Sequence, residues 1–203
     1  MPKMLGRFAL VPLMLLAGCV TLPAIPFLGG GGVPSLSLLG GDVTAVGPNG
    51  YCVDPESSSA RSGFAIIAPC DTMGPFEGTA PSRRGLLSLQ VGAEGAVDLD
   101  GVSDLLANAE TREALLGTDE VLTRSTLDSG SGVLVVYRTK APASDRVQPL
   151  EARAFLSLAN RLSTVMVRGT SKAPLSAEGI ERLALDAISA LTAANRAEAA
   201  DAS

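Results

Sequence analysis

The chain of 203 residues is long enough for one ordinary domain with extensions. It is 46% hydrophobic but only 3% aromatic, so its core must consist mainly of Leu, Val, Ile and Ala. The absence of histidine excludes the commonest general base and every Ser-His or Cys-His nucleophile. With 16 basic against 21 acidic residues and a net charge of −5, the chain also lacks the basic, aromatic-interleaved stripe of a nucleic-acid-binding protein.

The first 18 residues have the organisation of a secretory signal peptide. Two basic residues, Lys3 and Arg7, precede the apolar run FALVPLMLLAG. A run of this length is typical of a signal-peptide core, and it is shorter than the roughly 20 apolar residues of a membrane-spanning helix. We therefore expect residues 1–18 to be removed.

The end of this run, Leu16-Ala17-Gly18-Cys19, resembles the lipobox of bacterial lipoproteins. The resemblance implies cleavage between Gly18 and Cys19, a diacylglycerol-modified Cys19 thiol and an acylated new amino terminus, which together anchor a protein firmly without a spanning helix. Val20 rather than Asp follows the cysteine, which by resemblance to enterobacterial sorting implies the outer membrane, facing the periplasm. A plain secretory signal with an incidental cysteine, or an uncleaved anchor, are the alternatives.

The segment after Cys19 is rich in Gly and Pro and nearly uncharged. We expect residues 19–41 to form a flexible tether that lifts the folded domain off the membrane. The four glycines at 29–32 are not followed by Lys and Ser or Thr, so they do not form a phosphate-binding loop.

A single domain is expected over residues 42–197, and its first third reads as strands. A Gly-Pro-Asn-Gly turn joins two of them. A continuous apolar run predicts a buried strand, and a period of two predicts a strand with one face exposed to water. The turn lies in DVTAVGPNGYCVD, the continuous apolar run is SGFAIIAPC, and the period of two is seen in GLLSLQVG.

The middle of the domain changes to helical spacing and then returns to strands. One helix is predicted over residues 103–117, with Ser103 as its N-cap and Gly117 just past its end. Two hairpins follow, EVLTRSTLDSGSGVLVVYRTK with its turn at 128–132, and LEARAFLSLANRLSTVMVRG with its turn near Ala159 and Asn160.

The last element is the clearest. Ile180, Leu183, Ala187 and Leu191 recur at helical spacing, Ser176 can cap the start, and residues 198–203 should fray. Hairpins imply an antiparallel sheet, and the apolar stripe of the helix must be buried against it. We therefore predict an α+β fold, an antiparallel β-sheet packed against a long C-terminal amphipathic helix, with one further helix mid-chain.

The order of these elements resembles the layout of PsbP-like domains. The resemblance rests on PNGYCVDP early in the domain, EARAFLSLANRLSTVMVRG late in it, and the helix that ends it, and it covers residues 42–197. It implies an antiparallel sheet flanked by helices that serves in binding or assembly, and it supplies no catalytic residue.

Cys52 and Cys70 remain once Cys19 is used for lipid. An even number of cysteines in an oxidising compartment favours a disulfide, which would stabilise the fold by about 3 kcal/mol for a loop of about 18 residues. The alternative is two buried thiols that never meet, because sequence separation does not place two Cα atoms at bonding distance.

Metal and catalytic motifs are weak. Asp98, Asp100 and Asp104 are spaced like the start of a calcium loop, but Val102 and Ala109 stand where that loop needs acids. These acids suit the N-terminus of a helix instead. No Ser-x-x-Lys or Gly-x-Ser-x-Gly pattern occurs. We expect no metal, no cofactor and no enzymatic activity.

The leading hypothesis is a membrane-anchored envelope lipoprotein that acts as a non-enzymatic binding or assembly module. Its expected partners are the membrane, through the lipid anchor, and another envelope protein, with no nucleic acid. The alternative is a periplasmic carrier of a small apolar ligand or lipid, and a histidine-free hydrolase is a remote one. An internal cavity would favour the carrier, and a filled core with an exposed apolar patch would favour the binding module.

Overall fold

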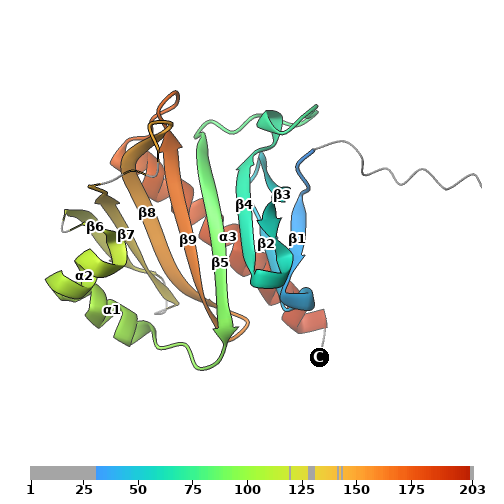
Figure 1. Ribbon diagram of the computed structural model, residues 1–203. Coiled ribbons are helices and arrows are strands. Elements are labelled where there is room, and N and C mark those ends of the chain that lie inside the picture. Colours follow the sequence, from blue (N-terminus) through green and yellow to red (C-terminus); the bar gives the residue numbers. More distant parts are fainter. Residues whose placement is uncertain (1–30, 119, 128–130, 141, 143, 202–203) are drawn as a thin grey trace, which may run out of the picture.

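The structure, a computed structural model, describes residues 31–201 except for 119, 128–130, 141 and 143. Its centre is a seven-stranded antiparallel sheet in the order β3-β4-β5-β9-β8-β7-β6. The long helix α3 lies on one face, and α1 and α2 lie on the other face near β7 (Figure 1). The predicted α+β class, with a long terminal helix packed on an antiparallel sheet, is confirmed.

The strands of this sheet follow a simple plan, because β3 to β5 form one meander and β6 to β9 another. The two halves meet where β5 pairs with β9. Their bounds are β3 (Tyr51–Ser59), β4 (Phe64–Pro69), β5 (Gly85–Glu94), β6 (Val121–Thr126), β7 (Gly132–Arg138), β8 (Val147–Leu158) and β9 (Arg161–Thr170), and short 3-10 helices η1 (Leu39–Gly41), η2 (Ala60–Ser62) and η3 (Cys70–Thr72) lie in the connections.

A separate hairpin, β1 (Ser35–Leu38) and β2 (Val43–Val46), precedes the sheet. It includes residues that the sequence assigned to the tether. Val33 exchanges two backbone hydrogen bonds with Val53, of 2.9 and 2.8 Å, and Leu38 is fully buried. The described fold thus includes residues before 42, because the alternating SLSL segment pairs with VTAV. The predicted signal peptide, Cys19 and tether residues 19–30 lie outside the described residues.

Two helices stand where one was predicted. α1 (Leu99–Ala107) is capped by Asp98, whose side chain accepts the Gly101 N–H at 2.7 Å, so Ser103 is not an N-cap. Asn108 then takes an extended conformation, with ψ 131°, that ends α1. Its side chain accepts the first N–H groups of α2 (Ala109–Leu116), at 2.9 and 3.2 Å. The prediction of a single mid-chain helix is therefore wrong, because Asn108 ends the first helix and caps the second. Gly117 ends α2 in the left-handed conformation, as predicted.

Helix α3 (Ala177–Asp201) begins at its predicted cap, where Ser176 Oγ accepts the Gly179 N–H at 3.1 Å. It continues to Asp201 and so includes residues 198–201 of the predicted tail. Its apolar stripe packs on the sheet with exposed fractions of 2% or less, over Ile180, Leu183, Ala184, Ala187 and Leu191.

Helix α3 also holds the β1-β2 hairpin in place. The Asn195 side chain accepts the Thr44 N–H at 2.9 Å and donates to the Thr44 carbonyl at 3.0 Å, as a neighbouring strand would. The main core therefore lies between α3 and β2 on one side and the sheet on the other.

Candidate binding surface

The two faces of the sheet are covered to different extents. On one face, α3 packs on β8 and β9, and every second residue of the strands belongs to the main core. On the other face, α1 and α2 cover β7 and part of β8 around a smaller core that contains Tyr137 and Phe155. Among the residues that the structure describes, no helix lies over β9, β5 and β4 on this second face (Figure 1).

We call this bare region the open face. Pairing of neighbouring strands brings its residues into rows, so that Ile66 lies opposite Ser88, and Ser88 opposite Met166. The members are side chains of β4, β5 and β9 that point away from α3: Phe64, Ile66, Ala68, Leu86, Ser88, Gln90, Leu162, Thr164, Met166 and Arg168.

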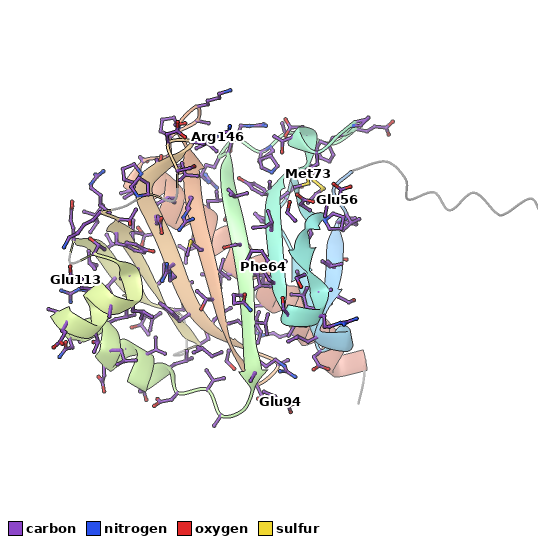
Figure 2. All side chains as sticks on the ribbon, viewed as in Figure 1. Glu56, Phe64, Met73, Glu94, Glu113 and Arg146 are labelled. Atoms are coloured by element: carbon purple, nitrogen blue, oxygen red, sulfur yellow. A yellow bond between two sulfur atoms is a disulfide. The ribbon has the colours of Figure 1, made fainter. Side chains whose placement is uncertain are left out.

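The open face is apolar where an uncovered face of an antiparallel sheet is ordinarily polar. Phe64, Ile66, Leu86 and Met166 are all half-buried, and Leu162 is 37% exposed. Figure 2 shows Phe64 on this face, toward the centre of the sheet. Single exposed apolar residues are common, but six of the ten members are apolar and lie on three neighbouring strands, with Ser88 and Gln90 between them, which makes this face a candidate interaction site.

Strand β4 corrects one expectation from the sequence. The continuous apolar run of SGFAIIAPC predicted a buried strand, and the structure shows that its two faces are buried to different extents. Only the alternate residues Ala65 and Ile67 are buried in the core, at 0 and 1% exposed, while Phe64, Ile66 and Ala68 stand on the open face. The run is apolar on both sides for different reasons: one side forms the core, and the other forms the candidate surface.

A buried ionic network borders the open face toward α2. Glu151 is 2% exposed, accepts the Tyr137 hydroxyl at 2.7 Å and lies 2.8 Å from Arg168 Nε. Burial, together with the bond to Glu151, raises the pKa of Tyr137 well above its usual value. Arg153 stacks 5.7 Å from the centre of the Tyr137 ring and donates to the Leu115 carbonyl at 2.7 Å, which ties α2 to the sheet.

This network is structural in its chemistry. Glu151 is the one acidic side chain that is buried within the described residues, and both of its oxygens are occupied. No sequence motif predicted this network; the alternation of Glu151 and Arg153 with apolar residues in the EARAF segment was its one local signal.

Two clefts lie at the surface, on either side of α3. One, of about 630 Å³, lies between α3, the turn before β3 and residues 79–83. The other, of about 560 Å³, lies between α3 and β6. The space between α3 and the sheet is filled by core side chains such as Leu183 and Leu191. This arrangement favours the binding module over the carrier.

The floor of the first cleft is a tyrosine engaged in internal bonds. Tyr51 Oη accepts the Gly85 N–H at 2.9 Å and donates to the Arg83 carbonyl at 2.7 Å, and burial raises the pKa of Tyr51. The Arg83 side chain forms an ion pair with Asp186 at 2.7 Å on the rim. The cleft is therefore bounded by groups that already have partners.

The cysteines singled out from the sequence and a surface ion pair lie at separate places. Cys52 and Cys70 are joined in a disulfide that ties β3 to the end of β4, with a Cα–Cα distance of 4.8 Å (Figure 2). Arg84 forms a bidentate pair with Asp71, with two bonds of 2.9 Å, which lowers the pKa of that carboxyl. Gly18 and Cys19 lie outside the described residues.

Neither a metal-binding cluster nor a membrane-spanning helix is present in the described part of the chain. No group of three or more His, Cys, Asp or Glu side chains there could hold a metal ion. Among the helices that the structure describes, none has both the length and the apolar character needed to cross a bilayer.

Comparison with known proteins gives only a distant likeness. No protein-family model matches the chain, and no curated protein matches it in sequence. Among solved structures, the chain is similar to the Ran-binding protein Mog1p of Saccharomyces cerevisiae, with 15% identity, 77% of this chain and 92% of that chain covered, and a TM-score of 0.48. A point mutant of protein Mog1 gives 16% identity, 77% and 93% coverage, and a TM-score of 0.48. A likeness at this level assigns neither a family nor a function.

Proposed function

We propose that this protein is a non-enzymatic binding module of the cell envelope, held at a membrane by lipid on Cys19, and that its open face docks another envelope protein. The observation that carries the proposal is the group of six apolar side chains on the open face of β4, β5 and β9. Covering such a group releases about 25 cal/mol per Å² of apolar surface removed from water.

The shape of the surface favours a protein as its occupant. The side chains stand on a broad and regular sheet, and the two clefts described above lie beside α3 on the opposite face. Small apolar ligands bind in concave pockets that enclose most of their surface, whereas protein interfaces are flat and extended. A flat apolar face with arginines at its border matches the composition of protein interfaces.

The anchor part of the proposal rests on the residues Leu16 to Cys19 and on the basic and apolar segments before them. Replacement of Cys19 by Ala should abolish labelling by a fatty-acid analogue and release the protein from membranes. Retention on membranes without label would contradict the anchor and leave the open face to be judged separately.

Site-specific photocrosslinking tests the docking surface. Ser88 lies at the centre of the open face, between Ile66 and Met166, and is a suitable position for a photoreactive amino acid. A discrete protein adduct from position 88 in intact envelopes is expected. The matched control is the same group at Arg182, which is exposed on α3. Adducts at both positions, or at neither, would contradict the proposal, and an adduct with lipid alone would favour the carrier.

A further inference from the structure

The register of the sheet joins the Glu151 network to the open face through Arg168. Tyr137 on β7 lies opposite Glu151 on β8, and Glu151 lies opposite Arg168 on β9. Arg168 in turn lies opposite Leu86 on β5. Side chains in such a row stand on the same face of the sheet, with Cβ atoms of neighbouring strands about 5 Å apart. Arg168 is therefore the member of the network that a molecule on the open face would meet.

The network has two cations for one carboxylate. Glu151 is 2% exposed, and its oxygens contact the Tyr137 hydroxyl at 2.7 Å and Arg168 Nε at 2.8 Å. The second cation, Arg153, bonds the Leu115 carbonyl of α2 and lies over the Tyr137 ring. One positive charge is left over once Glu151 is counted, and Arg153 is already held against α2.

Seen from the described residues, the Arg168 guanidinium keeps unused donors. Its contact with Glu151 is an ion pair without an aligned hydrogen bond, and its side chain donates no hydrogen bond to any residue that the structure describes. The side chain is nevertheless only 24% exposed. A guanidinium carries five N–H donors, and its terminal nitrogens can bind one carboxylate in a bidentate pair. With respect to the described fold, these nitrogens are available to a carboxylate of another molecule.

Charge is unevenly placed on and around the open face. Arg168 is the one charged residue among the ten members of this face, on a chain with 21 acidic and 16 basic residues. At the opposite border, Asp54 of β3 lies opposite Ile66, and its carboxylate accepts two backbone N–H groups of the turn that follows it, at 3.0 and 3.2 Å. An acidic group is therefore attracted to the β9 side of the face and repelled from the β3 side.

We propose that the protein docked on the open face places the carboxylate of an Asp or Glu side chain on the terminal nitrogens of Arg168, and packs apolar side chains beside that acid on Leu86 and Met166. The inference rests on the proposed docking and specifies the chemistry of the partner, an acidic residue set among apolar ones. Leu86 faces Arg168 across the strand pair, and Met166 precedes it by two residues on the same face.

Arg168 would then select among apolar partners. A partner without an acid at this point would cover Arg168 and leave its remaining donors without an acceptor, which costs free energy. A partner with an acid there gains an ion pair that the surrounding side chains shield from salt. Discrimination of this kind depends on the penalty for the wrong partner as much as on the contact with the right one.

A carboxylate built into the protein can stand in for that of the partner. Leu86→Glu places one opposite Arg168, and Gln90→Glu places one four residues farther along β5 on the same face. Leu86 is half-buried and Gln90 is exposed, so burial alone would make the pKa at position 86 the higher of the two. The inference predicts the reverse, with the carboxyl group at position 86 titrating about one pH unit below that at position 90, because a nearby cation favours the charged form.

NMR titration of the isotope-labelled, purified variants between about pH 3 and pH 7 measures both pKa values. Leu86→Gln is the matched control for the loss of the leucine, because it has nearly the same shape as Leu86→Glu and no charge. A pKa at position 86 equal to or above that at position 90 would overturn the inference, since Arg168 would then have no attraction left for a second carboxylate.

Crosslinking from position 88 in intact envelopes tests the acid of the partner itself. The adduct should be about tenfold weaker in Leu86→Glu than in Leu86→Gln, because the new carboxylate occupies Arg168 and repels the acid of the partner. Both variants lose the same leucine, so the difference between them reports the charge. Equal adducts, or a stronger one with Leu86→Glu, would overturn the inference and leave docking on the open face in place. Absence of any adduct with Leu86 intact would instead count against the proposed function.

Discussion

Val165 and Met166 are neighbours in β9 whose side chains lie on opposite faces of the sheet. Val165 is 1% exposed and belongs to the core beneath α3, whereas Met166 is half-buried on the open face, opposite Ser88. The same apolar character therefore serves folding at one position and, in our proposal, binding at the next. This distinction can be tested by placing one charge at each.

Met166→Glu should leave the free energy of unfolding within about 0.5 kcal/mol of the wild type, because the new carboxylate reaches water. Val165→Glu places a charge in the core and should lower that free energy by more than about 4 kcal/mol. Chemical denaturation of the two variants measures the difference. Equal and large losses would show that the open face is part of the hydrophobic core.

The network around Glu151 should be sensitive to which member is removed. Tyr137→Phe deletes one hydrogen bond to a buried carboxylate and should cost about 1–2 kcal/mol. Glu151→Ala leaves Arg168 beside the core without its partner and should cost more, about 3 kcal/mol. Chemical denaturation measures both losses of free energy, from the shift of the midpoint between curves whose dependence on denaturant has the same slope. The reverse order would mean that Arg168 is satisfied by solvent and that the ion pair contributes little.

Removal of the disulfide should destabilise the domain without changing its fold. Cys52 and Cys70 are 18 residues apart, and a loop of this size predicts a loss of about 3 kcal/mol when the bond is broken. The double variant Cys52→Ser with Cys70→Ser should show this loss in a denaturant titration, and wild type in reductant should match it. An unchanged midpoint in reductant would indicate that the two thiols are not joined.

Stability should fall in alkali because two tyrosines resist ionisation in the folded state. The pKa values of Tyr51 and Tyr137 are raised by burial above the ordinary value near 10. A raised folded-state pKa contributes stability that is fully present below the unfolded pKa and is lost as pH rises through the folded one.

The free energy of unfolding should therefore decline above about pH 10, by up to about 1.4 kcal/mol per pH unit for each tyrosine. Tyr51→Phe is less stable at neutral pH but should show a shallower decline. Denaturant titrations at several pH values between 8 and 11 measure the slope, and an identical slope in wild type and variant would argue against the role of Tyr51.

The sequence predicted correctly those features that depend on residue spacing, caps and turns within a short segment of the chain. The spacing along α3, its Ser176 cap and the turn at Ala159 and Asn160, both with positive φ, are as expected. The alternation in β5 likewise placed Leu87 and Leu89 in the core. Each of these features depends on neighbours within a few positions in the chain.

The candidate surfaces depend instead on what covers each element, which no local pattern records. The apolar run of β4 is equally compatible with burial on both faces, and within the described part of the chain no helix covers β4 on the side of Phe64 and Ile66. The network of Tyr137, Glu151 and Arg168 joins three strands through register alone. The division of the mid-chain helix at Asn108 is different, because its signal was local. Asn108 is a residue type that favours the N-cap position, and its side chain does cap α2.

Footprinting of the open face in its native surroundings tests the proposed docking most directly. A photoactivated carbene reagent applied to intact envelopes and to the purified soluble domain reports the accessibility of Ile66 and Met166 in each. Docking predicts several-fold lower labelling of both in envelopes, with unchanged labelling of Leu105, which is 48% exposed on α1. Equal labelling of Ile66 and Met166 in the two preparations would show that nothing covers this face and would contradict the proposed function.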